Sequence, residues 1–186
     1  MKNFLLPLFL IFSSLSHGID VKIQGINLFV NDEPFYMKGI CYHPVKKGQT
    51  KRNFTNLKED LELMKEAGIN TIRVYEPIDD IKVLDQFHDS GIKVVIGFGY
   101  NQRGQFDIVS GTFINYIRKY KDHEAILMWE LGNEYTYNAQ WFDGDINNWY
   151  KAMEFVAQTI QSEDSSRLVS SAHGDLPSND ALRIAS

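Results

Sequence analysis

Short apolar segments alternate with longer amphipathic ones along most of this 186-residue chain, and this alternation restricts the fold more than any other feature. The apolar segments have the length of β-strands and lie at residues 36–41, 70–75, 92–97, 125–131 and 167–171. Apolar residues at helical spacing fill the intervals between them, and Pro77 is expected in the first turn of the helix that follows residues 70–75. Asn31-Asp32 is expected to form a turn between two extended runs, residues 21–30 and 34–41. Since the strands are apolar on both faces, we expect a parallel sheet covered by helices, which places the chain in the α/β class.

Two α/β architectures fit this order: an open, doubly wound sheet and a closed (β/α)8 TIM barrel. An open sheet that binds nucleotides or phosphates usually carries a glycine-rich loop after its first strand. Here the first strand leads into residues 40–44 (ICYHP), and the glycines of residues 97–104 lack the G-x-G-x-x-G spacing. The sequence therefore argues against a nucleotide or phosphate binder.

Polar and aromatic residues follow the end of every predicted strand. They are His43, Arg73, Tyr75, Tyr100, Asn101, Asn133, Glu134, His173 and Asp175. The carboxyl ends of the strands form the active-site face of a (β/α)8 barrel. We therefore predict a TIM barrel with its site at these strand ends.

The length of the chain limits how much of such a barrel it contains. The predicted strands recur about every 33 residues, and eight such units need roughly 260 residues, close to the usual barrel size. We therefore expect residues 19–186 to be the N-terminal part of a barrel that is truncated after about the fifth strand. Such a fragment is expected to be inactive by itself.

Residues 1–18 have the pattern of a cleaved secretory signal peptide. Lys2 precedes an apolar run at 4–12, and residues 13–18 are mostly small or polar. The run is too short for a stable membrane span, and a buried N-terminal helix is the alternative. Secretion, or export to a periplasm, is the predicted destination. The single cysteine, Cys41, cannot form an internal disulfide, and the net charge of −5 argues against a nucleic-acid partner.

Asn133 and Glu134 are the residues that most directly suggest chemistry. A glutamate at the mouth of a buried strand suits general acid/base catalysis, because burial and neighbouring groups can tune its pKa. The asparagine beside it can hold a sugar hydroxyl. The alternative is that Glu134 is an ordinary loop residue exposed to solvent.

The stretch 129–134 (WELGNE) resembles the fourth-strand Asn-Glu signature of clan A glycoside hydrolases. It is especially similar to family 5 β-mannanases and to the barrel domains of family 2. Residues 36–44, 69–75 and 120–127 resemble, in turn, the first strand, the second strand and the approach to the fourth strand of those families. Residues 73–75 (RVY) are also similar to the fungal-type β-1,3-glucanosyltransferases of family 72.

The resemblance implies a retaining mechanism that uses two glutamates. Glu134 would be the acid/base, Asn133 the partner of the sugar 2-hydroxyl, and Arg73 the residue that orients the nucleophile. The nucleophile belongs at the end of the seventh strand, beyond residue 186. The predicted activity is hydrolysis of O-glycosyl bonds in a β-linked oligo- or polysaccharide; the alternatives are a β-glucanosyltransferase and a non-catalytic carbohydrate-binding barrel.

Aromatic and histidine side chains are the candidates for binding the sugar. Aromatic faces stack on sugar rings, and packing in the core or rim is the alternative for each of them. The candidates are His43, Tyr100, Tyr135, Trp141 and His173. Glu130 is expected to be a structural carboxylate paired with a base such as Arg73. No His/Asp/Glu cluster has metal-ligand spacing, so neither a metal nor another cofactor is predicted.

Overall fold

The computed structural model describes residues 18–99, 106–108, 110–176, 178–179 and 183. The predicted signal peptide lies outside these residues except for Gly18, and it stays a prediction. Tyr100 also lies outside them. Among the described residues, no helix combines the length and apolar character needed to cross a membrane.

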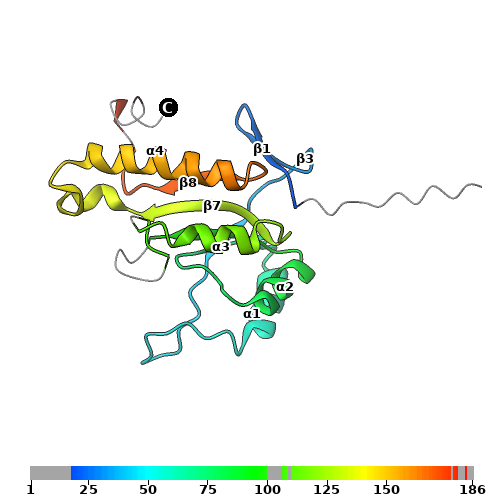
Figure 1. Ribbon diagram of the computed structural model, residues 1–186. Helices are drawn as coiled ribbons and strands as arrows, with labels where there is room; N and C mark the ends of the chain where they lie inside the picture. Colours follow the sequence, from blue (N-terminus) through cyan, green and yellow to red (C-terminus); the bar gives the residue numbers. More distant parts are fainter. Residues whose placement is uncertain (1–17, 100–105, 109, 177, 180–182, 184–186) are drawn as a thin grey trace, which may run out of the picture.

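The described residues form two sheets and the helices that join their strands (Figure 1). The larger sheet is parallel, with strand order β4-β5-β6-β7-β8. Its strands and connecting helices follow one another as β4 Gly39–Cys41, α1 Leu57–Glu66, β5 Thr71–Val74, α2 Ile81–Asp89, β6 Lys93–Phe98, α3 Phe113–Tyr120, β7 Ile126–Asn133, α4 Ile146–Glu163 and β8 Leu168–Ala172. Two short 3-10 helices, η1 Tyr135–Tyr137 and η2 Ala139–Phe142, lie between β7 and α4. This order confirms the predicted α/β class and the parallel sheet.

The parallel sheet is open in the described part of the chain. Neighbouring strands pair in parallel register from β4 to β8, and no pairing joins these two outer strands within the described residues. A closed barrel therefore remains a prediction.

One face of the sheet carries the helices. Outward-pointing strand residues such as Ile72, Ile96 and Trp129 pack with apolar side chains from all four helices in a single core. In α2, for example, Val83, Leu84 and Phe87 are buried, whereas Ile81 is 54% exposed. Alternation along the strands sends every second residue to the opposite face.

The start of α2 differs from the prediction made from Pro77, which was expected in the first turn of this helix. The helix begins at Ile81, because the side chain of Asp80 caps it by accepting a hydrogen bond from the backbone N–H of Lys82 at 3.0 Å. The carbonyl of Pro77 instead accepts a hydrogen bond from Arg52. That expectation was wrong, and the capping residue Asp80, which lies after Pro77, explains why.

The second sheet is small and antiparallel, with β1 Val21–Gln24, β2 Asn27–Val30 and β3 Glu33–Pro34. Asn31 and Asp32 both have positive φ in the turn between β2 and β3, as a tight hairpin requires. This confirms the predicted turn, whereas a second turn, between β1 and β2, was not foreseen. Apolar residues of this sheet pack on the first residues of β6 and β7, so the sheet lies at the amino ends of the parallel strands (Figure 1).

Arg167 ties together the amino ends of the last two strands. Its Nε donates to the carbonyl of Ile126 at 2.8 Å, and its Nη2 donates to the carbonyl of His123 at 3.0 Å. Its Nη1 lies 3.1 Å from Asp164, whose carboxylate also accepts a hydrogen bond from the Trp129 indole at 2.8 Å. The side chain of Arg167 is fully buried, so this cluster belongs to the folded framework.

Candidate functional site

Arg73 joins β5 to β7 at the carboxyl ends of the strands. Its Nε and Nη2 lie 2.6 and 2.5 Å from Glu130 Oε1, and its Nη2 donates to Asn133 Oδ1 at 2.9 Å. The predicted pairing of Glu130 with Arg73 is confirmed. The structure also brings Arg73 and Asn133 together, although 60 residues separate them in the sequence.

The electrostatics of this network keep Arg73 charged. Burial alone would lower the pKa of its guanidinium, but the hydrogen bond and the charge of Glu130 outweigh burial and raise the pKa above its usual value. Cys41, which pairs with Arg73 in the β4–β5 register, has its Sγ 3.8 Å from Nη1. The arrangement is a fixed positive charge, bounded by one carboxylate and one amide, that can orient a further anionic or hydroxyl group.

Arg73, Glu130 and Cys41 line a hollow of about 400 Å³ on the face of the sheet that the helices leave uncovered. Polar and small residues alternate there with a few apolar ones: Met37, Gly39, Ile40, Cys41, Thr71, Arg73, Val95, Met128, Glu130, Ser170 and Ser171. In a closed barrel this face would be the interior, with the carboxyl ends open to substrate.

Glu134 is exposed and directly follows β7. Its backbone is left-handed, with φ 52° and ψ 36°, and its N–H donates to the carbonyl of Ala172 on β8 at 2.9 Å. A non-glycine residue in this region costs roughly 1–3 kcal/mol, and such strain gathers at functional sites. The tether to β8 holds the strained residue at the mouth of the sheet.

The chain bends just before Glu134. The pairing of β7 with β8 shifts register between Leu131 and Asn133, which marks a bulge, and bulges re-aim side chains beside active sites. Gly132 within it has φ +68°, and a side chain there would begin 3.1 Å from the ring of Trp149. Glycine is therefore required at this position both for its backbone conformation and for space.

The predicted sugar-binding residues fall into different environments. His43 is exposed at the end of β4, with its ring 6.0 Å from that of Tyr75. The Arg73 guanidinium lies 4.7 Å above the same tyrosine ring. Tyr75 was noted at a strand end but not assigned to the site, although its position two residues after Arg73 puts both on one face of an extended chain.

His173 follows β8 and stacks on Tyr150, with ring planes 7° apart and centroids separated by 5.8 Å. Its Nε2 is buried and has no hydrogen-bond partner among the described residues. A buried polar atom without a partner carries a free-energy penalty that a bound hydroxyl would remove.

Tyr135 and Trp141 are neighbours with unequal exposure. Tyr135 is 3% exposed, and its hydroxyl donates to the carbonyl of Gly99, so it takes the core-packing alternative in this structure. Trp141 is 43% exposed and meets the Tyr135 ring edge-on at 5.3 Å. Tyr137, which the sequence reasoning missed, is 57% exposed and close to Gly174. No group of three or more His, Cys, Asp or Glu side chains within the described ranges is arranged to hold a metal ion.

A family model described as Glucanosyltransferase, for glycoside hydrolase family 72, matches residues 11–170. The match covers the parallel sheet from β4 to the start of β8, the Arg73 network and the Asn133-Glu134 pair. The chain belongs to glycoside hydrolase family 72. The predicted resemblance to clan A glycoside hydrolases is thereby confirmed, and of the three families compared from the sequence, the family model selects the one suggested by Arg73-Val74-Tyr75.

Characterised family 72 relatives match at modest identity. The 1,3-beta-glucanosyltransferase gel1 of Aspergillus fumigatus is 32% identical over 83 residues, covering 41% of this chain and 18% of that protein. The 1,3-beta-glucanosyltransferase gas2 of Schizosaccharomyces pombe is 27% identical over 96 residues, covering 45% of this chain and 21% of that protein. The chain thus aligns with about a fifth of the length of these relatives.

Solved structures show the same fold. A Parabacteroides merdae beta-glucuronidase superposes with a TM-score of 0.66 at 19% identity, covering 82% of this chain and 20% of that one. A family 2 beta-galacturonidase from Eisenbergiella tayi gives a TM-score of 0.66 at 24% identity, covering 83% of this chain and 28% of that one. At these identities the likeness concerns the arrangement of strands and helices.

Proposed function

We propose that this protein is part of a retaining β-1,3-glucanosyltransferase, with Glu134 as its acid/base. The observation that carries the proposal is the contact of Arg73 with both Glu130 and Asn133, which sets a charged, oriented group beside the strained residue Glu134. Membership of family 72 and the chain's similarity to proteins named as 1,3-beta-glucanosyltransferases support transfer over plain hydrolysis. This is the alternative that the sequence analysis had placed second.

The proposed reaction has two displacements. A carboxylate nucleophile attacks the anomeric carbon, and the glycosidic bond breaks as Glu134 gives its proton to the leaving 3-oxygen. Glu134 then removes the proton from the 3-hydroxyl of a second glucan chain. That oxygen attacks the anomeric carbon and releases the nucleophile, so one β-1,3 bond is broken and one is formed.

Other side chains of the site have positioning roles in this proposal. Asn133 would hold the 2-hydroxyl of the reacting sugar, and Arg73 would orient the nucleophile. The exposed faces of His43 and Trp141 would contact sugar rings, as would Tyr100, whereas Tyr135 is buried and would support Trp141 from the core. The unpartnered Nε2 of His173 would meet a sugar hydroxyl.

The full-length protein incubated with a β-1,3-gluco-oligosaccharide of one length tests this proposal. Products longer than the starting chain are expected. Shorter products alone would identify a hydrolase, and unchanged substrate would identify a binding protein. Glu134→Gln should lower turnover by about 10²–10⁴-fold, whereas the same change at Glu62, which is exposed on α1, should not.

An activated aryl glycoside sharpens the role of Glu134. A good leaving group needs little protonation, so Glu134→Gln should slow its release far less than it slows cleavage of a glucan. Azide should then partly restore turnover, because it attacks the intermediate without a base. Equal losses on both substrates with no rescue would exclude Glu134 as the acid/base.

Export is a separate proposal that rests on the apolar run at residues 4–12. Ile19, directly after the expected cut, is 3% exposed and packs with Val21 of the small sheet. N-terminal sequencing of exported protein should therefore begin near Ile19. Finding Met1 at the terminus would refute the signal peptide.

A further inference from the structure

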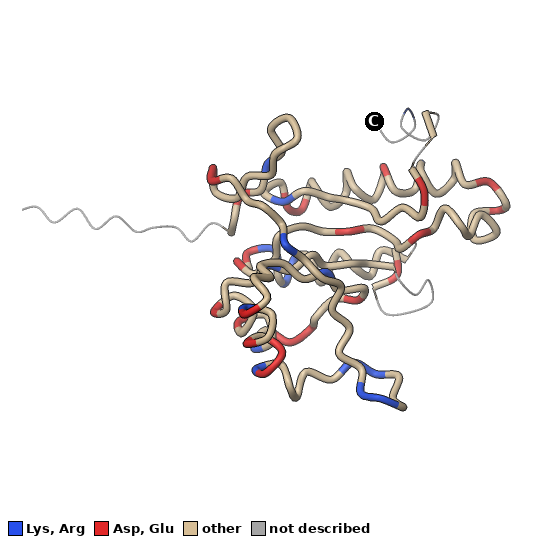
Figure 2. Tube along the Cα trace, turned by 180° about the vertical axis from the view of Figure 1, so that it is seen from behind, with Lys and Arg blue, Asp and Glu red and all other residues tan. Residues whose placement is uncertain are grey.

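The net charge of −5 conceals one strongly basic loop. Lys46, Lys47, Lys51 and Arg52 are four of the 19 Lys and Arg residues, and they lie within seven positions. Figure 2 shows this basic segment at the end of a loop that projects from the rest of the molecule. The basic loop, residues 45–52, leaves the carboxyl end of β4, the side on which Arg73 and Glu134 also lie.

The foot of the basic loop is firmly held. Val45 and Arg52 form an antiparallel bridge, and the Asn53 N–H donates to the Pro44 carbonyl at 2.7 Å. Arg52 donates to the carbonyls of Glu76 and of the following proline, both at 2.7 Å. The loop is thus fastened to the segment that follows β5.

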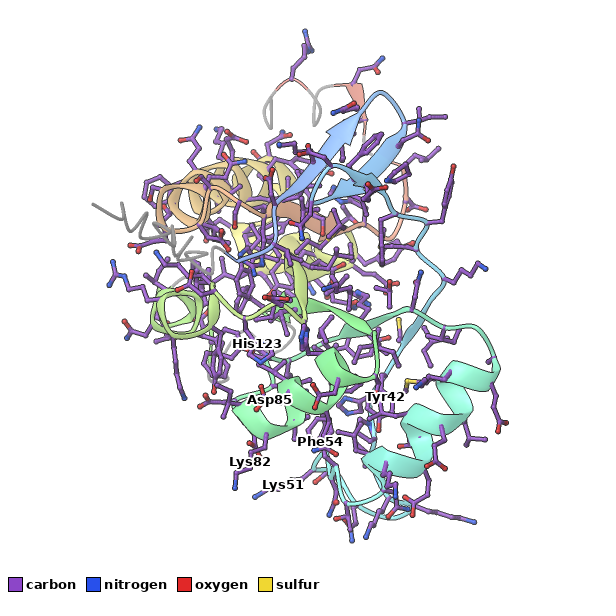
Figure 3. The ribbon with its side chains drawn as sticks, turned by 90° about the vertical axis from the view of Figure 1, so that its right-hand side faces the viewer. Tyr42, Lys51, Phe54, Lys82, Asp85 and His123 are labelled. Atoms are coloured by element: carbon purple, nitrogen blue, oxygen red, sulfur yellow. The ribbon has the colours of Figure 1, made fainter. Side chains whose placement is uncertain are left out.

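Aromatic packing supports the same foot. The Arg52 guanidinium lies 5.7 Å from the centre of the Phe54 ring, which is 6.3 Å from the ring of Tyr42. Figure 3 labels Tyr42 and Phe54 there, together with Lys51 of the loop. At the tip, Gln49 donates to the Lys46 carbonyl at 2.9 Å around Gly48, whose φ of +80° suits a tight turn. A loop fixed in this way presents its side chains at defined places.

Lys46, Lys47 and Lys51 are exposed, and none forms an ion pair with a residue that the structure describes. Arg52 differs, since both ends of its guanidinium are occupied by carbonyls. Three like charges held within six positions repel one another, and an anion placed among them would relieve that repulsion. The charges of the basic loop therefore favour binding of a negatively charged group.

We propose that the basic loop binds an anionic polysaccharide, one that carries phosphate or carboxylate groups, as it runs across the carboxyl ends of the strands. The proposal rests on the proposed function, because the bound polymer would be a charged form of the β-1,3-glucan that the sugar site takes. Exposed carboxylates of Glu134, Asp143, Asp145 and Asp175 follow β7 and β8 on the same side. A flat anionic membrane would be repelled by these groups, whereas a polymer chain can place its charged groups at the lysines and its uncharged sugar units at the carboxylates.

Binding to carboxymethylated β-1,3-glucan tests the proposal directly. The full-length protein carrying Glu134→Gln is used, so that binding is measured without turnover, and unmodified glucan of the same length is the neutral comparison. The triple change Lys46→Gln, Lys47→Gln and Lys51→Gln should weaken binding of the charged glucan about tenfold at low salt, as three surface charge contacts warrant. High salt should abolish the difference, and binding of neutral glucan should not change.

A matched triple change of exposed lysines on α1 and α2, at Lys58, Lys65 and Lys82, controls for total charge. The proposal is overturned if this control weakens binding as much as the loop variant, or if the loop variant binds the charged glucan normally. Loss of binding to anionic lipid vesicles with glucan binding intact would instead identify a membrane contact, and it would also overturn the proposal. Transfer activity on neutral glucan should be normal in the loop variant, so failure of the proposed function would be seen separately.

Discussion

Two arginines lie at opposite ends of the parallel sheet, and their surroundings differ. Arg167 at the amino ends is fully buried and hydrogen-bonds mainly to backbone carbonyls, and it also pairs with the Asp164 carboxylate. Arg73 at the carboxyl ends has a side chain 20% exposed, and its guanidinium hydrogen-bonds, within the described part of the chain, to the side chains of Glu130, Asn133 and Cys41. Backbone partners fix the fold, whereas side-chain partners facing a hollow can be shared with a ligand. The amino end of the sheet, around Arg167, therefore holds the fold together, and we call it the framework end. The carboxyl end, around Arg73, presents groups that can bind a ligand, and we call it the chemical end.

The largest expected effect is on stability at the amino end. Arg167→Met should lower the free energy of unfolding by about 3–5 kcal/mol, because it leaves the Asp164 carboxylate buried without its partner. Denaturant unfolding of the full-length protein measures the loss. Arg118→Met is the control, since Arg118 pairs with Glu163 at an exposed position and should cost at most about 1 kcal/mol. Similar losses for the two variants would remove the distinction between the ends.

Arg73→Lys should affect activity more than stability. Lysine keeps the charge but cannot contact Glu130 and Asn133 at once with a planar fork. A displaced nucleophile then lowers glucan transfer by about 10²-fold, while the free energy of unfolding should change by less than about 1 kcal/mol. Initial rates of oligosaccharide elongation and a denaturation curve measure the two quantities. A stable variant with normal transfer rates would show that Arg73 does not position the reacting groups.

Acid should weaken the framework end through Asp164. Burial alone would raise the pKa of this carboxyl, but the hydrogen bond from Ser166, the charge of Arg167 and the Trp129 indole together lower it. A folded-state pKa below the unfolded value of about 3.9 stabilises the protein above that pH, and this stabilisation is lost as the pH falls through the folded pKa. The loss is roughly 1.4 kcal/mol per unit of lowering. In Asp164→Asn, the free energy of unfolding should fall less steeply as the pH is lowered, which denaturant unfolding at several pH values measures. An unchanged fall would show that Asp164 is not its cause.

The smallest effects compare two serines. Ser166→Ala removes the hydrogen bond that the serine hydroxyl donates to the Asp164 carboxylate at 2.7 Å, and it should cost about 1 kcal/mol. Ser170→Ala removes only a 3.4 Å contact with the Trp129 carbonyl on the hollow side and should cost close to nothing. Thermal unfolding resolves the pair, and an equal loss at Ser170 would mean that the hollow also contributes to the framework.

Part of this architecture follows from the sequence alone. Apolar runs of strand length, separated by helical periodicity, predicted each parallel strand because burial on both faces requires such runs. Arg73, Asn133 and Glu134 were selected from their places at strand ends, since parallel strands bring their carboxyl ends to one edge. These features could be predicted because each strand, helix and strand end depends mainly on residues close together in the sequence.

Only the tertiary structure decided the rest. The single extended run at residues 34–41 divides between two sheets, because its first part pairs with β2 and its last part with β5. Tyr135 is buried through contacts with residues distant in the sequence, and its residue type alone does not predict whether it is buried or exposed. Arg167 and Arg73 are likewise the same residue type beside predicted strands. Their roles differ because folding brings different partners to each guanidinium. Arg167 hydrogen-bonds to the carbonyl of Ile126, 41 residues away, and Arg73 to the side chain of Asn133, 60 residues away.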